Sequence, residues 1–199
     1  MSLQVDDRPY GGGPGMVMRA EPVIKAVESA LMKIKNYELR INNGKTKTKN
    51  KRRASTDTAR RDFAKSKILT VNFVPSAEKF DTKIAKTFSQ KYTDIIMICG
   101  RYEGIDARVD KILKTKKISI GDYVLTGGEI PAMILVDSIS RQIEGVLGNF
   151  NSREEERVSS SEIYTRPEIL VHNKKKYKVP PVLLSGHQKN INDWKNKVK

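Results

Sequence analysis

Cysteine and histidine are scarce in this sequence. Its 199 residues include one cysteine, Cys99, and two scattered histidines. A single cysteine cannot form an internal disulfide, and these three side chains give no metal-binding cluster, so we predict no metal site. Because Cys99 ends the apolar run IIMIC (95–99), we expect it to be a small core residue rather than a reactive thiol.

Long hydrophobic runs are also missing. The run at 95–99 is far too short to cross a bilayer, and the first residues contain no apolar secretory segment. The sequence therefore predicts a soluble, cytoplasmic protein that does not bind membranes. The hydrophobic content of 38% is sufficient for one core, or for one domain with a small appendage.

Positive charge, in contrast, is abundant and unevenly distributed. The net charge is +15, and residues 33–67 contain 13 lysines and arginines against three acidic residues. Residues 172–199 contain eight lysines against one aspartate. Two basic segments on a nearly neutral body favour a nucleic-acid partner over lysines that only keep loops solvated. A membrane surface is less favoured because neither segment has an apolar face.

The spacing of apolar residues predicts an α/β fold. Helical spacing covers 21–35 and 78–92, and apolar strands are expected at 68–74, ended by Pro75, and at 94–100. Strands that are apolar on both faces and are separated by a helix indicate a parallel sheet covered by helices.

The remaining segments are less regular. We expect a basic surface insertion at 42–67 and two short strands, separated by glycines, within 118–133. A helix is expected from near Pro131 to Gly145, followed by a charged linker at 149–162. A Lys-rich link and a helix that starts at Ser185 or Gly186 complete the chain.

Three glycine clusters lie near the ends of the predicted strands, at 11–15, 100–104 and 121–128. None matches the Walker phosphate loop or the dinucleotide-binding fingerprint. The ends of the strands are where an α/β sheet places its ligand. From composition alone, tight turns and a ligand site are equally supported.

Six stretches, in this order, carry a closer resemblance: VDDRPYGGGPGM (5–16), ICGRYEGIDARV (98–109), SIGDYVLTGGEIPAM (119–133), DSISRQIEGVLG (137–148), YTRPEIL (164–170) and VPPVLLSGH (179–187). Together they resemble the bacterial tRNA (guanine-N1)-methyltransferase family, TrmD, of the SPOUT class. The resemblance implies an α/β parallel sheet with a deep C-terminal trefoil knot, a rare exception to unknotted chains. It also implies a methyltransferase domain over 1–148, a linker at 149–162 and the start of a small helical, tRNA-binding C-terminal domain at 163–199.

The resemblance further implies that S-adenosylmethionine is the cofactor and that the knot loops bind it. Bare glycine backbone would then read the adenine edge, Tyr102, Tyr123 and Leu125 would supply apolar contact, and Glu103 would face the cationic end of the donor. The expected cofactor residues are Pro75, Gly100, Tyr102, Glu103, Gly104, Ser119, Ile120, Gly121, Asp122, Tyr123, Val124, Leu125, Gly127, Gly128 and Pro131.

By the same resemblance, the substrate is tRNA and the product carries a methyl group on N1 of the guanosine that follows the anticodon, at position 37. Arg141 matches the family arginine that stabilises charge on O6, and Glu156 falls opposite the family's catalytic aspartate. Residues 11–15 are expected to approach RNA or donor, with Asp6, Arg8 and Gly15 as substrate-binding residues. Family members act as homodimers with a shared active site.

The sequence also departs from the family pattern. The strand and helix that precede VDDRPYGG in the family are not present, and the C-terminal domain stops soon after Trp194. We therefore expect either a fragment or a divergent member. With Glu156 in place of aspartate, the alternative function is a catalytically weakened or inactive basic RNA-binding relative.

Overall fold

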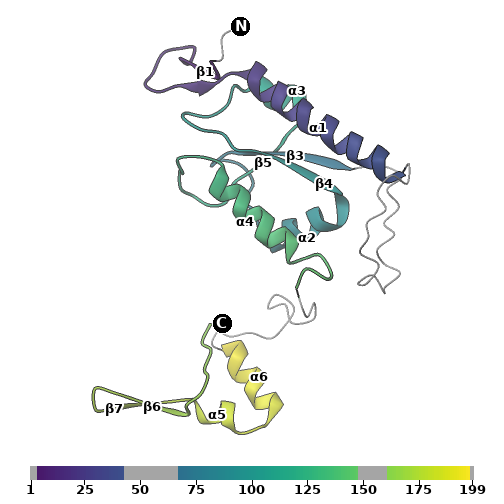
Figure 1. Ribbon diagram of the computed structural model, residues 1–199. Coiled ribbons are helices and arrows are strands. Elements are labelled where there is room, and N and C mark those ends of the chain that lie inside the picture. The colour runs from purple at the N-terminus through teal and green to yellow at the C-terminus, as the bar shows by residue number, and fades with distance from the viewer. Residues whose placement is uncertain (1–3, 43–66, 148–160, 198–199) are drawn as a thin grey trace. The chain divides into compact units, whose positions relative to one another are not determined.

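A computed structural model describes residues 4–42, 67–147 and 161–197, with side chains placed up to residue 39 of the first range (Figure 1). The chain forms two compact units, Met1–Ile143 and Glu144–Lys199. Most of the predicted insertion at 42–67 and of the predicted linker at 149–162 lies outside the described residues.

The first unit is built on a three-stranded parallel sheet of order β4-β3-β5. Its strands are β3 (Ile68–Phe73), β4 (Asp94–Ile98) and β5 (Lys116–Ile118). The central strand places Asn72 between Ile98 of β4 and Lys117 of β5. The parallel sheet predicted from the two apolar runs is thereby confirmed.

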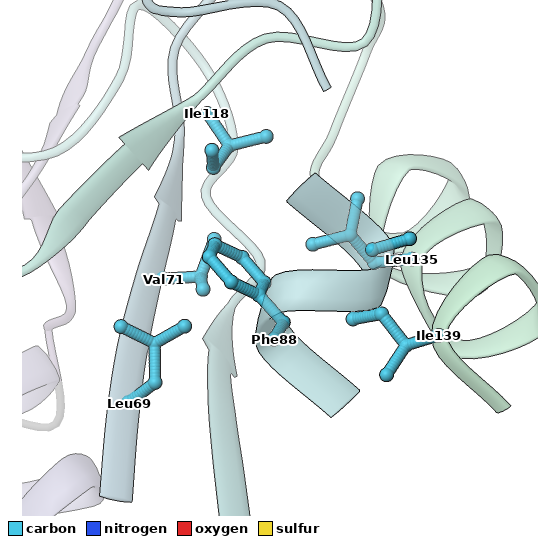
Figure 2. Close-up of a cluster of buried hydrophobic side chains, with 7 residues drawn as sticks. Leu69, Val71, Phe88, Ile118, Leu135 and Ile139 are labelled. Carbon is cyan, nitrogen blue, oxygen red and sulfur yellow. The ribbon is translucent and has the colours of Figure 1, made fainter. Parts of the chain in front are cut away.

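Helices cover both faces of this sheet. Helices α2 (Thr82–Lys91) and α4 (Glu129–Ser140) pack on one face, where the buried side chains are Leu69, Val71, Ala85, Phe88, Ile118, Leu135 and Ile139 (Figure 2). Helices α1 (Ala20–Asn42) and α3 (Arg108–Leu113) pack on the other face, around Val23, Val27, Ile98 and Val109. The sheet is therefore the middle layer of three.

Helices α1 and α2 begin or end at residues other than those predicted. Helix α1 continues to Asn42 rather than ending at 35, because residues 36–42 contain neither proline nor glycine and so nothing stops the helix. Helix α2 starts at Thr82 rather than 78. The Asp81 carboxylate accepts a hydrogen bond from the Ile84 N–H at 2.8 Å and so caps the helix.

The region 118–133 does not form the two short strands that we predicted. Only Lys116–Ile118 is a strand. Ser119 extends the pairing by a single parallel bridge to Lys79, with Ser119 N to Glu78 O at 2.8 Å and Phe80 N to Ser119 O at 2.7 Å. The chain then turns at Gly121, whose φ is positive. Helix α4 starts at Glu129, after the loop at 119–128, and ends at Ser140, before the predicted limit at Gly145.

The sequence did not predict α3, nor the antiparallel pair of β1 (Asp6–Asp7) and β2 (Val17–Met18). This pair flanks the N-terminal glycine loop. The strand β2 also contacts the loop after β4, with Met18 N donating to Gly104 O at 2.9 Å.

The second unit contains a β-hairpin where we predicted only a Lys-rich link, and the helix predicted after this link is present. Strands β6 (Ile169–His172) and β7 (Lys175–Lys178) are antiparallel and are joined by Asn173 and Lys174, both with positive φ, as a tight hairpin turn requires. Helices α5 (Pro181–Leu184) and α6 (Gln188–Lys197) follow. Helix α6 starts later than predicted because Gly186 has positive φ. No helix among the described residues is both long and apolar enough to cross a membrane.

A candidate ligand pocket at the carboxyl ends of the strands

A pocket of about 470 Å³ lies where the parallel strands end. Its walls come from the ends of β3 and β5, the loops after β4 and β5, and the first turns of α3 and α4. The carboxyl edge of a parallel sheet is where side chains and backbone from several strands converge on a ligand. Among the described residues, no group of His, Cys, Asp and Glu is arranged to hold a metal ion.

The loop after β4 is held in an unusual backbone conformation. Tyr102 has a φ of 60° and Gly104 a φ of 124°, and the Tyr102 side chain is largely exposed. A positive φ is uncommon for an aromatic residue and persists only where surrounding contacts enforce it. Those contacts come from the N-terminal segment, since Glu103 N donates to Met16 O at 3.0 Å.

Cys99 begins this loop and is half-buried. Burial raises the pKa of its thiol, the Glu129 charge raises it further, and the Arg101 charge acts in the opposite direction. Cys99 is not among the buried core residues, so the prediction of a small core residue is not confirmed, whereas the raised pKa of its thiol agrees with the expected low reactivity.

The loop after β5 is folded around its own glycine. The buried hydroxyl of Ser119 donates to the Gly121 carbonyl at 3.0 Å and accepts from the Gly121 N–H at 3.2 Å. Gly121 has a φ of 156°, and a Cβ on it would overlap the ring of Tyr123. This loop also exposes apolar surface beside the pocket, on Tyr123, Val124 and Leu125.

The two loops are joined at the start of α4. Gly128 N donates to Gly100 O at 2.9 Å, and a Cβ on Gly128 would lie 2.6 Å from the Cα of Cys99. Only glycine permits this approach of two backbones. Arg101 and Glu129 add an exposed ion pair at 2.9 Å across the same junction, a contact of the kind that contributes at most about 1 kcal/mol.

Most of the predicted cofactor residues line this one pocket. These are Pro75, Gly100, Tyr102, Glu103, Gly104, Ser119, Ile120, Gly121, Tyr123, Val124, Leu125, Gly127, Gly128 and Pro131. Asp122 does not line it. Its exposed carboxylate instead pairs with Lys79 at 2.5 Å.

The predicted substrate and catalytic residues are placed elsewhere. Gly15 lies against the pocket residue Glu103, since a Cβ on it would be 2.7 Å from the Glu103 carboxyl oxygen, whereas Asp6 and Arg8 do not line the pocket. Arg141 caps the far end of α4, about 20 Å along the helix axis from Gly128. Glu156 lies outside the described residues.

Residues that the sequence analysis did not single out also line the pocket. They include Asn72, Arg101, Ile105, Asp110, Lys117 and Thr126. Asp110 accepts hydrogen bonds from Asn72 Nδ2 at 2.9 Å and from Thr115 Oγ1 at 2.5 Å, and pairs with Lys117 at 3.0 Å. The signal that could have found this cluster is Asn72, a polar residue within an otherwise apolar strand.

Asp106, just outside the pocket lining, gives a prediction for acid stability. Hydrogen bonds from the Arg108 side chain, at 2.6 and 2.9 Å, and from its backbone lower the pKa of Asp106 to about 2. A carboxyl with a lowered pKa stabilises the fold above its ordinary pKa of 3.8 and loses this effect as pH falls toward about 2. Between about pH 6 and about pH 3, we expect the melting temperature of Asp106→Asn to fall less than that of the unmodified chain.

The matched variant for this prediction is Arg108→Gln, which removes the side-chain partner of Asp106. Its melting temperature should also fall less than that of the unmodified chain over the same pH range. An identical fall for Asp106→Asn and the unmodified chain would contradict the assigned ion pair.

Comparison with known proteins identifies relatives over nearly the whole chain. A family model described as tRNA (Guanine-1)-methyltransferase TrmD matches residues 2–199. Curated proteins named tRNA (guanine-N(1)-)-methyltransferase are similar to it: 40% identical over 198 residues in Carboxydothermus hydrogenoformans (98% of this chain, 63% of the relative), 41% over 197 residues in Dictyoglomus turgidum (97% and 64%) and 38% over 197 residues in Vibrio campbellii (97% and 66%). The chain thus spans less than two thirds of the length of these relatives.

Proposed function

Since the chain belongs to the TrmD family of tRNA (guanine-1)-methyltransferases, we propose that it methylates N1 of the guanosine at position 37 of tRNA with S-adenosylmethionine as donor. The observation that carries this proposal is the convergence of nearly all the predicted cofactor residues on one pocket. Family membership also supports a trefoil knot formed by the segments around this pocket.

The pocket has the properties that S-adenosylmethionine requires. The backbones of Gly100 and Gly128 approach too closely to admit a Cβ on Gly128, so backbone rather than side chain lines this part of the pocket and could contact an adenine ring. Tyr123 and Leu125 supply apolar surface, and the carboxylate of Glu103 supplies a negative charge for the sulfonium. A site that combines apolar walls with a few polar groups is typical of small-ligand binding.

Bound S-adenosylmethionine supplies an activated methyl group, so the chain's own residues have to position the guanine and manage its charge. The donor, held by the pocket residues, would supply its methyl group to N1, and the electron pair of the broken carbon–sulfur bond would remain on sulfur. Glu156 accepts the N1 proton, and Arg141 stabilises the negative charge that develops on O6.

The position of Arg141 supports a site shared between two copies of the chain. Arg141 lies at the opposite end of α4 from Gly128 and outside the pocket lining. The same helix exposes a set of apolar side chains, namely Ile130, Met133, Ile134 and Val136. A second copy would cover this surface and bring its own residues to the site. Light scattering coupled to gel filtration should give the mass of a dimer, and a monomer at every concentration would contradict this part of the proposal.

A second candidate function is RNA binding without catalysis. Its support is the basic charge of residues 33–67 and the glutamate at position 156, whose extra methylene displaces the carboxyl oxygens by about 1 Å. Such a protein would bind tRNA with strong salt dependence and would transfer no methyl group.

The experiment that separates these functions uses S-adenosylmethionine with an isotopically labelled methyl group and two tRNA transcripts, with guanosine or adenosine at position 37. After digestion to nucleosides, we expect labelled 1-methylguanosine from the first transcript only. Salt-sensitive binding of both transcripts without labelled nucleoside would instead establish the second function.

A further inference from the structure

The pocket contains a buried polar residue at the end of the central strand. Asn72 is 5% exposed, lines the pocket, and lies between Ile98 and Lys117 in the sheet. Burying an amide is costly unless its polar atoms find partners. Its place at the carboxyl end of the middle strand makes it a candidate to contact a ligand.

The neighbouring Asp110 fixes which way this amide points. Burial raises the pKa of Asp110. This effect is outweighed by hydrogen bonds from Thr115, Lys117 and Asn72 and by the charge of Lys117, so the pKa of Asp110 is lowered overall and its carboxyl is ionised. An ionised carboxylate only accepts hydrogen bonds, so the group 2.9 Å from it must be the Asn72 NH2. The carbonyl oxygen Oδ1 is therefore the atom that points away from Asp110.

Asn72 Oδ1 has no hydrogen-bond donor among the described residues, and no ion pair or ring contact involves this side chain there. Lys117, about half exposed, also lines the pocket and extends its ammonium to 3.0 Å from Asp110. The pocket thus presents an open acceptor and a carboxylate beside a cation. These groups are complementary in charge to a ligand group that carries both an ammonium and a carboxylate.

We propose that Asn72, Asp110 and Lys117 form the subsite for the zwitterionic amino-acid end of the methyl donor, an inference that depends on the proposed function. The α-ammonium donates to Asn72 Oδ1 and faces Asp110, and the α-carboxylate faces Lys117. Asp110 thereby holds Asn72 and Lys117 in position, and Glu103 remains free to face the sulfonium.

The test compares two ligands that differ in this end. Methylthioadenosine has the adenosine and the sulfur of S-adenosylmethionine but lacks the amino-acid group. In calorimetric titrations we expect Asn72→Leu, which keeps the volume and removes the acceptor, to weaken S-adenosylmethionine binding about 10- to 100-fold. Binding of methylthioadenosine should change less than about twofold, because Thr115 and Lys117 still satisfy Asp110.

Lys117→Met and Lys116→Met form a matched pair. Lys116 is the preceding residue of β5, does not line the pocket, and pairs with Glu78. We expect Lys117→Met alone to weaken S-adenosylmethionine selectively over methylthioadenosine. Circular dichroism melting of each variant identifies those that fail to fold. If Asn72→Leu fails to fold, the two lysine variants still test the proposal.

The outcomes separate the subsite from the function it depends on. If the unmodified chain binds neither ligand, the proposed function itself is wrong. Suppose that the unmodified chain binds S-adenosylmethionine. If folded Asn72→Leu and Lys117→Met then lose affinity for both ligands equally, or lose affinity for neither ligand, the proposed subsite is wrong, and the pocket is still the donor site. Selective loss of S-adenosylmethionine supports the proposal.

Discussion

Gly128→Ala is expected to abolish S-adenosylmethionine binding and to lower the melting temperature. The added Cβ would lie 2.6 Å from Cys99 Cα and 3.0 Å from Gly100 N, which are backbone atoms that cannot rotate away. The hydrogen bond from Gly128 N to Gly100 O would break, and the loops after β4 and β5 would separate. Calorimetric titration with S-adenosylmethionine, together with thermal unfolding, measures both effects.

Gly127→Ala is the control from the adjacent position. Its Cβ would meet the carboxylate of Glu129 and the middle of the Arg101 side chain, and both side chains are flexible and exposed. The loss is limited to their ion pair, so donor affinity should change by no more than a few fold, the equivalent of about 1 kcal/mol. Equal donor affinity in both variants would show that the junction at Gly128 does not shape the pocket.

Arg141→Ala is expected to lower the rate of methyl transfer to tRNA about 100- to 1,000-fold, the usual effect of removing a group that stabilises developing negative charge. Donor affinity should be unchanged because Arg141 lies outside the pocket lining. Single-turnover formation of 1-methylguanosine gives the rate, and a calorimetric titration gives the affinity.

Arg141→Lys separates a catalytic role of Arg141 from a role in stabilising the end of α4. It keeps the positive charge at the end of α4 but loses the planar guanidinium, so we expect an intermediate rate and an unchanged melting temperature. A rate for Arg141→Ala within a few fold of the unmodified chain would remove Arg141 from the catalytic assignment.

Strands β3 and β4 and the glycine loops could be predicted from the sequence because each is encoded locally. ILTVNFV and DIIMICG are mainly apolar runs of strand length, a pattern typical of buried parallel strands. The glycines of the loops after β4 and β5 follow directly, where the chain must turn or approach another backbone.

The polar cluster in the pocket could not be predicted in the same way. Asn72, Asp110 and Lys117 come from three segments, and only the register of β3 with β5 and the packing of α3 bring them together. Each taken alone is an ordinary polar residue. Asn72 was the one detectable signal, since a buried amide in an apolar strand requires partners.

The C-terminal hairpin shows how tertiary context outweighs composition. KKYK has little strand propensity, and its lysines suggested a solvated link. Pairing with ILVH places Leu170 opposite Tyr177, and the Asn173–Lys174 turn supplies the geometry that a two-residue hairpin requires. These are contacts between segments, which local propensity does not report.

The most direct test of the account is a calorimetric titration of the unmodified chain with S-adenosylmethionine, with circular dichroism on the same sample. Saturable binding by a folded protein, lost in Gly128→Ala and kept in Gly127→Ala, is the predicted result. A folded chain that shows no saturable binding would contradict the assignment of this pocket to the methyl donor and would leave RNA binding as the function to pursue.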